Sequence, residues 1–173
     1  MSVRRGGLFA IGMMLALCES LSGQGVELGA DVGVGVNSAN GSIVFNVATP
    51  TSFRVGMPVG RAVSLEPRIN LVFAAGEGDT FTTLDLSPAI LIAVGEGMRS
   101  GTYVALLPEI ALVSGFGETA SRFGAGAGIG VRLQRSETFG LRIEGQFVHA
   151  FENDDFASMN RVRALIGFSF FTR

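Results

Sequence analysis

Residues 62–73 read Ala-Val-Ser-Leu-Glu-Pro-Arg-Ile-Asn-Leu-Val-Phe. Side chains of a β-strand alternate between its two faces, so this stretch is predicted to form a strand with one apolar and one polar face. The apolar face carries Val63, Leu65, Pro67, Ile69, Leu71 and Phe73, and the polar face carries Ser64, Glu66, Arg68 and Asn70. Residues 139–151 repeat the pattern, with Arg142, Glu144 and Gln146 on the polar face. The fold has to accommodate both faces of many such strands.

The composition indicates one domain with an apolar environment. A chain of 173 residues suits a single core. Apolar residues make up 47% of it and charged residues only 16%, with a mean hydropathy of +0.44, which is high for a soluble protein. All 13 basic residues are arginine, and the net charge of -2 gives no electrostatic footprint for nucleic acid.

The first segment has the order of a secretory signal peptide. Arg4 and Arg5 precede the apolar run 8–18, which is shorter than the about 20 residues of a membrane-spanning helix. We expect residues 1–22 to be a cleavable signal and residues 23–173 the mature domain; cleavage after Gly25 is the alternative. Lipid modification of Cys18, the only cysteine, ranks lower because Leu17 replaces the small residue usual before such a site.

Strict alternation predicts eight strands after the signal, with no amphipathic helix and no linker. The predicted strands are residues 26–37, 53–59, 62–73, 81–93, 102–113, 123–133, 139–151 and 161–170. Residues 38–50, with the turn dipeptide Asn40-Gly41, are expected to be a loop or a frayed hairpin end, residues 114–122 a loop, and Gly60-Arg61 a tight turn. Pro67, Pro88 and Pro108 fall within strands, where they cannot donate to a ladder, and are expected to mark a common level of bulges.

The charges on the polar faces indicate that these faces line the interior of the barrel. They carry six acids, Glu27, Asp31, Glu66, Asp85, Glu109 and Glu144, and six bases, Arg54, Arg68, Arg132, Arg142, Arg161 and Arg163. A balanced, all-arginine set suits a closed interior, because guanidinium groups pair with carboxylates and buried charges need partners. Glycines 124, 126, 128 and 130 share one polar face and are expected to make space for long arginines.

The apolar faces are therefore predicted to contact lipid. The alternative is a soluble, lipocalin-like barrel, but the chain has no tryptophan for the Gly-x-Trp signature of that family. Phenylalanines near predicted strand ends suit the aromatic girdles of a membrane barrel. They are Phe53, Phe73, Phe123, Phe139, Phe151 and Phe170.

Residues 26–173 resemble the small bacterial outer-membrane β-barrels of the OmpA and OmpX type. The resemblance rests on Leu65-Glu66-Pro67, Leu84-Asp85-Leu86-Ser87-Pro88, Leu141-Arg142-Ile143-Glu144-Gly145 and the aromatic last strand. It implies an all-β, eight-stranded, antiparallel up-and-down transmembrane barrel in the outer membrane. It also implies contact with lipid and lipopolysaccharide, and assembly by periplasmic chaperones and the barrel-assembly machinery. The family ends on an aromatic residue, whereas here Thr172-Arg173 follows Phe171.

The sequence favours no catalytic, cofactor or metal site. His149 is the only histidine; its parity places it on the lipid face near the outer rim, and the serine two residues later in lipid A deacylases is replaced by Phe151. Ser64, Ser87 and Ser169 have no histidine as activating base. The expected outer loops carry Glu77, Asp79, Glu118, Glu152, Asp154 and Asp155 against Arg122. Divalent cations bridging these acids to lipopolysaccharide phosphates are a hypothesis.

We expect a monomeric barrel whose lumen is plugged by the twelve charged residues and whose role is structural or in envelope integrity. Eight strands leave an interior just wide enough for side chains, so a diffusive pore is not expected. The first alternative is a narrow conduit or binding site for a small apolar molecule, formed by an irregularity of the second strand near Pro50. The second is a lipid-modifying enzyme with His149.

Overall fold

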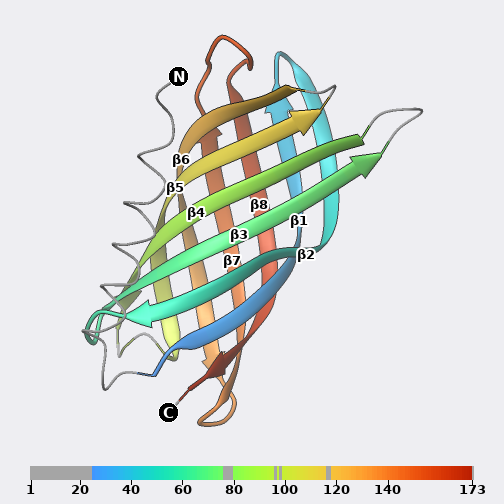
Figure 1. Cartoon of the computed structure of the whole chain (residues 1–173). Helices are drawn as coiled ribbons and strands as arrows, with labels where there is room; N and C mark the ends of the chain where they lie inside the picture. Colours follow the sequence, from blue (N-terminus) through green and yellow to red (C-terminus); the bar gives the residue numbers. More distant parts are fainter. Residues whose placement is uncertain (1–24, 76–79, 96, 98, 116–117, 173) are drawn as a thin grey trace, which may run out of the picture.

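The computed structural model describes residues 25–75, 80–95, 97, 99–115 and 118–172. Its described residues form eight strands and a closed barrel (Figure 1). The strands are β1 (Glu27–Ala39), β2 (Ser42–Pro58), β3 (Val63–Ala75), β4 (Thr80–Val94), β5 (Gly101–Gly115), β6 (Glu118–Gln134), β7 (Phe139–Ala150) and β8 (Met159–Phe171). Residues 1–22, the predicted signal peptide, lie outside the described residues.

Each strand pairs antiparallel with its neighbour in the chain, and β1 pairs with β8 to close the barrel. The all-β, up-and-down topology predicted from the sequence is confirmed. The closing seam is continuous from Glu27 opposite Phe171 to Ser38 opposite Asn160, so both ends of the domain lie at the same end of the barrel. Among the described residues, no helix is long and apolar enough to cross a membrane.

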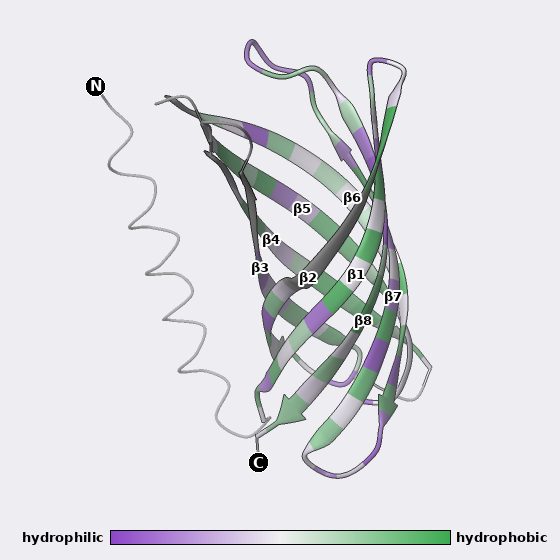
Figure 2. Cartoon of the chain, turned by 90° about the vertical axis from the view of Figure 1, so that its right-hand side faces the viewer, coloured by the Kyte–Doolittle hydropathy of each residue, from purple (hydrophilic) through white to green (hydrophobic). Residues whose placement is uncertain are grey.

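The two faces of the strands differ as the alternation predicted. On β7 and β8 every second side chain is buried in the barrel, as shown by Val148 at 1% and Phe147 at 50% exposure. Figure 2 shows the resulting bands of apolar and polar residues along the strands. Large apolar side chains are exposed on the outside of the barrel while charged ones are buried inside, the reverse of a soluble barrel.

The predicted loop at residues 114–122 is wrong, and of the two alternatives for residues 38–50 the structure has the hairpin end, because both segments are mostly strand. Residues 38–50 contain the end of β1, the Asn40-Gly41 turn and the start of β2; Asn40 and Gly41 have φ of 48° and 76°. Residues 114–122 likewise contain the end of β5 and the start of β6. In both hairpins, pairing with the neighbouring strand supplies backbone hydrogen bonds that overcome a polar or Gly-rich composition. The turn at Gly60-Arg61 is confirmed, with Val59 N donating to Val63 O at 2.8 Å.

The three strand prolines lie at a common level, but they do not form bulges. Pro67 lies opposite Pro88. The β4–β5 ladder stops after Leu86–Ile110 and resumes at Ile90–Leu106 with the same register, so Pro88 faces Pro108 without an inserted residue. A proline has no N–H to donate, and the ladder is interrupted rather than shifted.

β2 is the irregular strand of the barrel. Its register with β1 shifts between Asp31, opposite Ser52, and Gly33, opposite Ala48, so β2 inserts two extra residues around Pro50. Its pairing with β3 runs from Pro58–Ser64 only as far as Phe53–Ile69. Beyond that point residues 42–52 of β2 and 70–75 of β3 form no ladder with each other, and Figure 1 shows the two strands diverging. We call this unpaired stretch the β2–β3 seam.

Candidate functional site: a charged lumen

The interior of the barrel is lined by ionised side chains. The twelve residues predicted for the lumen all point inward and all take part in ion pairs with one another, in two separate groups. The inner cluster, towards the chain ends, contains Glu27, Asp31, Arg54, Glu66, Arg68, Arg132, Arg142 and Glu144. The outer cluster contains Asp85, Glu109, Arg161 and Arg163. No ion pair joins the two clusters within the described part of the chain.

Glu66 is the centre of the inner cluster. Its side chain is fully buried, and its Oε1 accepts hydrogen bonds from Arg68 Nε at 2.8 Å and Arg142 Nη1 at 2.7 Å. Its Oε2 accepts one from Arg132 Nη2 at 2.9 Å and lies 3.5 Å from Arg54 Nη1. One carboxylate thus holds guanidinium groups from four positions on four strands, which ties opposite walls of the barrel together.

Arg54 connects the β1 carboxylates to this centre. It contacts Glu27, and its Nε lies 3.1 Å from Asp31 Oδ2. Its Nη2 donates to Ser169 Oγ at 2.7 Å. A Cβ atom at Gly29 would overlap the Arg54 guanidinium, so glycine at this position of β1 provides the room that the arginine occupies.

Tyr103, a residue that the sequence analysis missed, completes the inner cluster. It is 1% exposed, its hydroxyl donates to Glu144, and its ring lies 5.2 Å from Arg132 Cζ and 5.6 Å from Arg142 Cζ. Glu144 also forms a bidentate pair with Arg68, at 2.6 and 3.1 Å. The hydroxyl of a tyrosine can donate to a buried carboxylate while its ring packs against guanidinium groups, so the residue suits this charged interior. Tyr103 has the same parity on β5 as Glu109, so the alternation already placed it in the lumen. A prediction limited to ionised side chains leaves it out.

The glycines of β6 make room for other groups than predicted. A Cβ at Gly130 would overlap the Tyr103 ring, and a Cβ at Gly126 would overlap Phe147 O and crowd Val148. The expectation that these glycines accommodate arginines is therefore wrong. The side chains nearest to these glycines are those of Tyr103, Val148, Glu144 and Gln146, and none of them is an arginine.

The outer cluster is looser. Arg161 is 4% exposed and binds both Asp85, at 3.2 Å, and Glu109. The side chain of Arg163 is 21% exposed and lies 3.2 Å from Asp85 and 3.9 Å from Glu109. The longer distance and partial exposure make its pairing with Glu109 the weakest contact of the network.

Arg122 belongs to the lumen, contrary to the prediction that it lies in an outer loop. It is on β6 opposite Ala111, which lies opposite Asp85 on the next strand. It interacts electrostatically with Asp85, and Phe156 of the β7–β8 loop lies over it with the ring centroid 5.4 Å from Cζ. Its Nε is buried without a hydrogen-bond partner in the described part of the chain.

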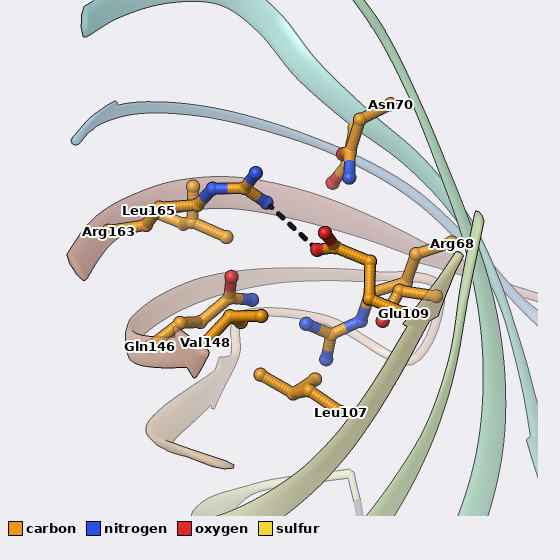
Figure 3. Close-up of a pocket in the computed structure, with 10 residues that line it drawn as sticks. Arg68, Asn70, Leu107, Glu109, Gln146, Val148, Arg163 and Leu165 are labelled. Carbon is orange, nitrogen blue, oxygen red and sulfur yellow. Dashed lines mark ion pairs between the residues drawn. The ribbon is translucent and has the colours of Figure 1, made fainter. Parts of the chain in front are cut away.

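A small cavity lies between the clusters, with a volume of about 10 Å³, close to the minimum for one water molecule (Figure 3). Leu107, Val148 and Leu165 form its apolar wall. Asn70 and Arg163 are on its polar side, and Figure 3 shows the Arg163 guanidinium turned towards Glu109.

The remaining candidate residues do not assemble a catalytic or metal site in the described part of the chain. His149 Nδ1 lies 2.8 Å from Asn160 Oδ1, and its ring packs edge-on against Phe151 at 5.3 Å. Ser64, Ser87 and Ser169 are buried in the lumen. No group of three metal-binding side chains occurs among the described residues. Of the loop acids, Glu77 and Asp79 lie outside the described residues, so the divalent-cation hypothesis stays a prediction.

Comparison with solved structures identifies the fold. No protein-family model and no curated protein sequence matches the chain. Neisserial surface protein A matches over 84% of this chain and 96% of its own, with a TM-score of 0.57 and 11% identity. The attachment invasion locus protein Ail of Yersinia pestis matches over 86% and 99%, with a TM-score of 0.55 and 10% identity. The outer membrane protein AlkL matches over 87% and 91%, with a TM-score of 0.55 and 10% identity.

The chain has the fold of the small outer-membrane β-barrels. Together with its apolar outer surface and charged interior, this fold places the protein in a bacterial outer membrane. The turns at 59–62 and 135–138 and both chain ends lie at one end of the barrel, and the β7–β8 loop and the β1–β2 turn lie at the other. Following the expectation that the acidic loops face outward, we call the first end periplasmic and the second extracellular.

Phenylalanines lie at both rims of the outer-membrane barrel. Phe139 and Phe170 pack against each other at 5.6 Å near the periplasmic side, and the exposed Phe123 and Phe151 lie near the extracellular side. Phe53 differs from the prediction because it lies within β2, opposite Ile69. The side chain of Phe73 lies outside the described ones.

Proposed function

We propose that this protein is a monomeric, non-catalytic outer-membrane barrel with a plugged lumen and a structural role in envelope integrity. The observation that carries the proposal is the closure of the lumen by buried ion pairs. The inner cluster matches four acids with four bases, and the largest exposed fraction among its side chains is 4%.

The plug leaves no route for solutes. The cavity between the clusters holds no more than about one water molecule. The pairs cross the lumen from several strands, as in the contacts of Glu66, so an opening would require several charge-assisted bonds to break at once. We also propose that residues 1–22 direct export, and that chaperones and the barrel-assembly machinery insert the chain.

Two measurements test this proposal. Folding is verified first by heat-modifiable migration on a gel, because a folded barrel runs compactly until boiled. Single-channel recordings of the folded protein in planar bilayers are then expected to show no conductance steps. Regular steps from the wild-type protein, absent from a boiled preparation, would overturn the plugged lumen.

The structural role is tested in cells. Deleting the gene in the source bacterium is expected to raise sensitivity to detergents and large antibiotics, and expression of the wild-type protein is expected to reverse it. Lipid A mass spectra of the two strains are expected to be identical. Unchanged sensitivity would contradict the envelope role, and a lipid A difference would indicate an enzyme.

A second candidate function is binding of a small, largely apolar molecule at the β2–β3 seam. The observation that favours it is the loss of pairing beyond Phe53–Ile69, next to the two extra residues of β2 around Pro50. The seam is a lateral interruption of the wall and does not require the lumen to conduct, so both candidates are compatible.

A further inference from the structure

The outer end of the lumen carries an excess positive charge. Asp85 and Glu109 are the acids there, and Arg161 and Arg163 pair with both. Arg122 adds a third guanidinium, so among the described lumen-facing side chains of this end two acids face three bases, an excess of one positive charge. The acids of the β7–β8 loop form no ion pair with Arg122 in the described part of the chain, and this excess calls for an anion.

Arg163 is the most accessible charge of the outer cluster. It is the most exposed member of the network, at 21% of its side chain, and its pairing with Glu109 is long, at 3.9 Å. It lines the cavity between the clusters together with Asn70 and Ser52. Figure 3 shows the Arg163 guanidinium pointing towards the Glu109 carboxylate among the residues that line this cavity.

The β2–β3 seam begins at the same cavity. Ser52 and Asn70 are the first residues beyond the last β2–β3 pair, Phe53–Ile69, and both line the cavity. Asn70 is seven residues from the start of β3 at Val63, which places it roughly 18 Å above the periplasmic turn for a strand tilted by about 40°. Because the apolar band is about 25 Å tall, the seam opens towards the outer leaflet.

The seam combines polar edges with apolar flanks. Its strands lack the β2–β3 ladder, and backbone groups left unpaired at membrane depth require another polar partner. Ile43, Val44 and Phe45 beside it are 64%, 54% and 79% exposed. Leu107, Val148 and Leu165 form the apolar wall of the cavity behind it. A purely apolar molecule would pack against the apolar side chains beside the seam. It would provide no partner for the unpaired backbone groups of the strand edges or for the excess positive charge.

We propose that the seam binds an anionic amphiphile with one alkyl chain, whose carboxylate or phosphate head lies against Arg163 within the field of Arg122. The chain lies along the seam, since the cavity itself is too small for it. This inference rests on the second candidate function and names its ligand class. A free fatty acid and a single-chain phospholipid share this chemistry, and the experiment separates them.

Photo-crosslinking tests the proposal with the full mature protein in phosphatidylcholine nanodiscs. Three probes carry a diazirine in a twelve-carbon chain and differ in the head: a carboxylate, a lysophosphatidic acid and an alcohol. Crosslinked peptides are mapped by mass spectrometry. The carboxylate, the lysophosphatidic acid or both are expected to label peptides of β2 and β3 at least about tenfold more than the alcohol, the ratio expected for a charge-assisted bond. The better-labelling anion identifies the source.

Variants locate the head group. Arg163→Gln and Arg122→Gln are each expected to reduce labelling by the anionic probes about tenfold and to leave alcohol labelling unchanged. Arg122→Gln removes no ion pair among the described residues, so it remains informative if Arg163→Gln fails to fold. Arg135→Gln, in the exposed periplasmic turn, is the matched control and is expected to label like the wild type.

A disulfide across the seam, which can be formed and reduced, tests whether labelling requires the seam to be open. The described strands contain no cysteine, so Ser52→Cys with Asn70→Cys forms the only thiol pair, and its oxidation is expected to suppress labelling that reduction restores. Equal labelling of the seam by the alcohol and the anions would overturn the anionic head and leave the second candidate function intact. No labelling of the seam by any probe would overturn both.

Discussion

Replacing Glu66 by glutamine removes the central charge of the inner cluster without changing its shape. Glu66 accepts hydrogen bonds from Arg68, Arg132 and Arg142 at 2.7–2.9 Å, and its side chain is 0% exposed. The variant leaves three acids against four bases, and its amide group directs N–H donors at guanidinium donors. Removing one partner of a buried pair costs about 3–5 kcal/mol, so the free energy of unfolding is expected to fall by that amount.

Urea titration in lipid vesicles measures this change, with the fraction of compactly migrating band as the readout. Asp154→Asn, in the exposed β7–β8 loop, is the matched control and is expected to change stability by less than about 0.5 kcal/mol. The double variant Glu66→Gln with Arg142→Gln restores three acids against three bases. It is expected to be less destabilised than the sum of the two single variants.

Two results would refute this reasoning. If Glu66→Gln unfolds with the free energy of the wild type, the pairs in the lumen do not depend on charge. If the double variant equals the sum of the single ones, Glu66 and Arg142 are not coupled, although Arg142 Nη1 lies 2.7 Å from Glu66 Oε1.

Three further predictions concern the packing of the lumen and the lipid face. Gly130→Val would press a side chain into the Tyr103 ring and is expected to destabilise the barrel by about 1–3 kcal/mol in urea titration, whereas Gly145→Ala, with open space around it, is expected to be neutral; equal effects would contradict the placement of Tyr103. Tyr103→Phe removes the hydroxyl that donates to Glu144 and should cost about 1–3 kcal/mol in the same assay, and a stability unchanged from wild type would argue against that contact. Ile166→Arg places a charge on the lipid face in the middle of β8 and should cost about 2–4 kcal/mol, against about 0–1 kcal/mol for Phe151→Arg near the rim; the reverse order would be incompatible with the orientation.

The alternation of side chains was enough to predict the strands and their faces. A one-residue slip moves every side chain of a strand to the other face, so period two fixes which residues share a side. Glu66, Arg68 and Arg142 could therefore be placed on one side without knowing their partners. Which acid meets which base was not predictable, because it depends on register between strands far apart in the sequence.

The misses have physical causes of the same kind. The polar, glycine-containing composition of residues 114–122 predicts a loop that includes Arg122, yet pairing with β5 extends the strand. Tyr103 and Leu91 are buried in the lumen, where the alternation alone predicts polar groups. At the β2–β3 seam the two strands do not pair. Residues 62–73 alternate as in a paired strand, so their sequence does not predict this loss of pairing. Pro50 did predict an irregular β2.

The orientation of the strands is tested most directly by spin labels along β8. Single cysteines from residue 162 to residue 170, each carrying a nitroxide in lipid vesicles, report collision rates with oxygen and with a water-soluble nickel complex. We predict oxygen access with a period of two, high at Val162, Ile166, Phe168 and Phe170 and low at Leu165 and Ser169, with little nickel access at the former set. High nickel access at Ile166 and Phe168, with oxygen access confined to Leu165 and Ser169, would contradict a barrel with lipid outside and charges within.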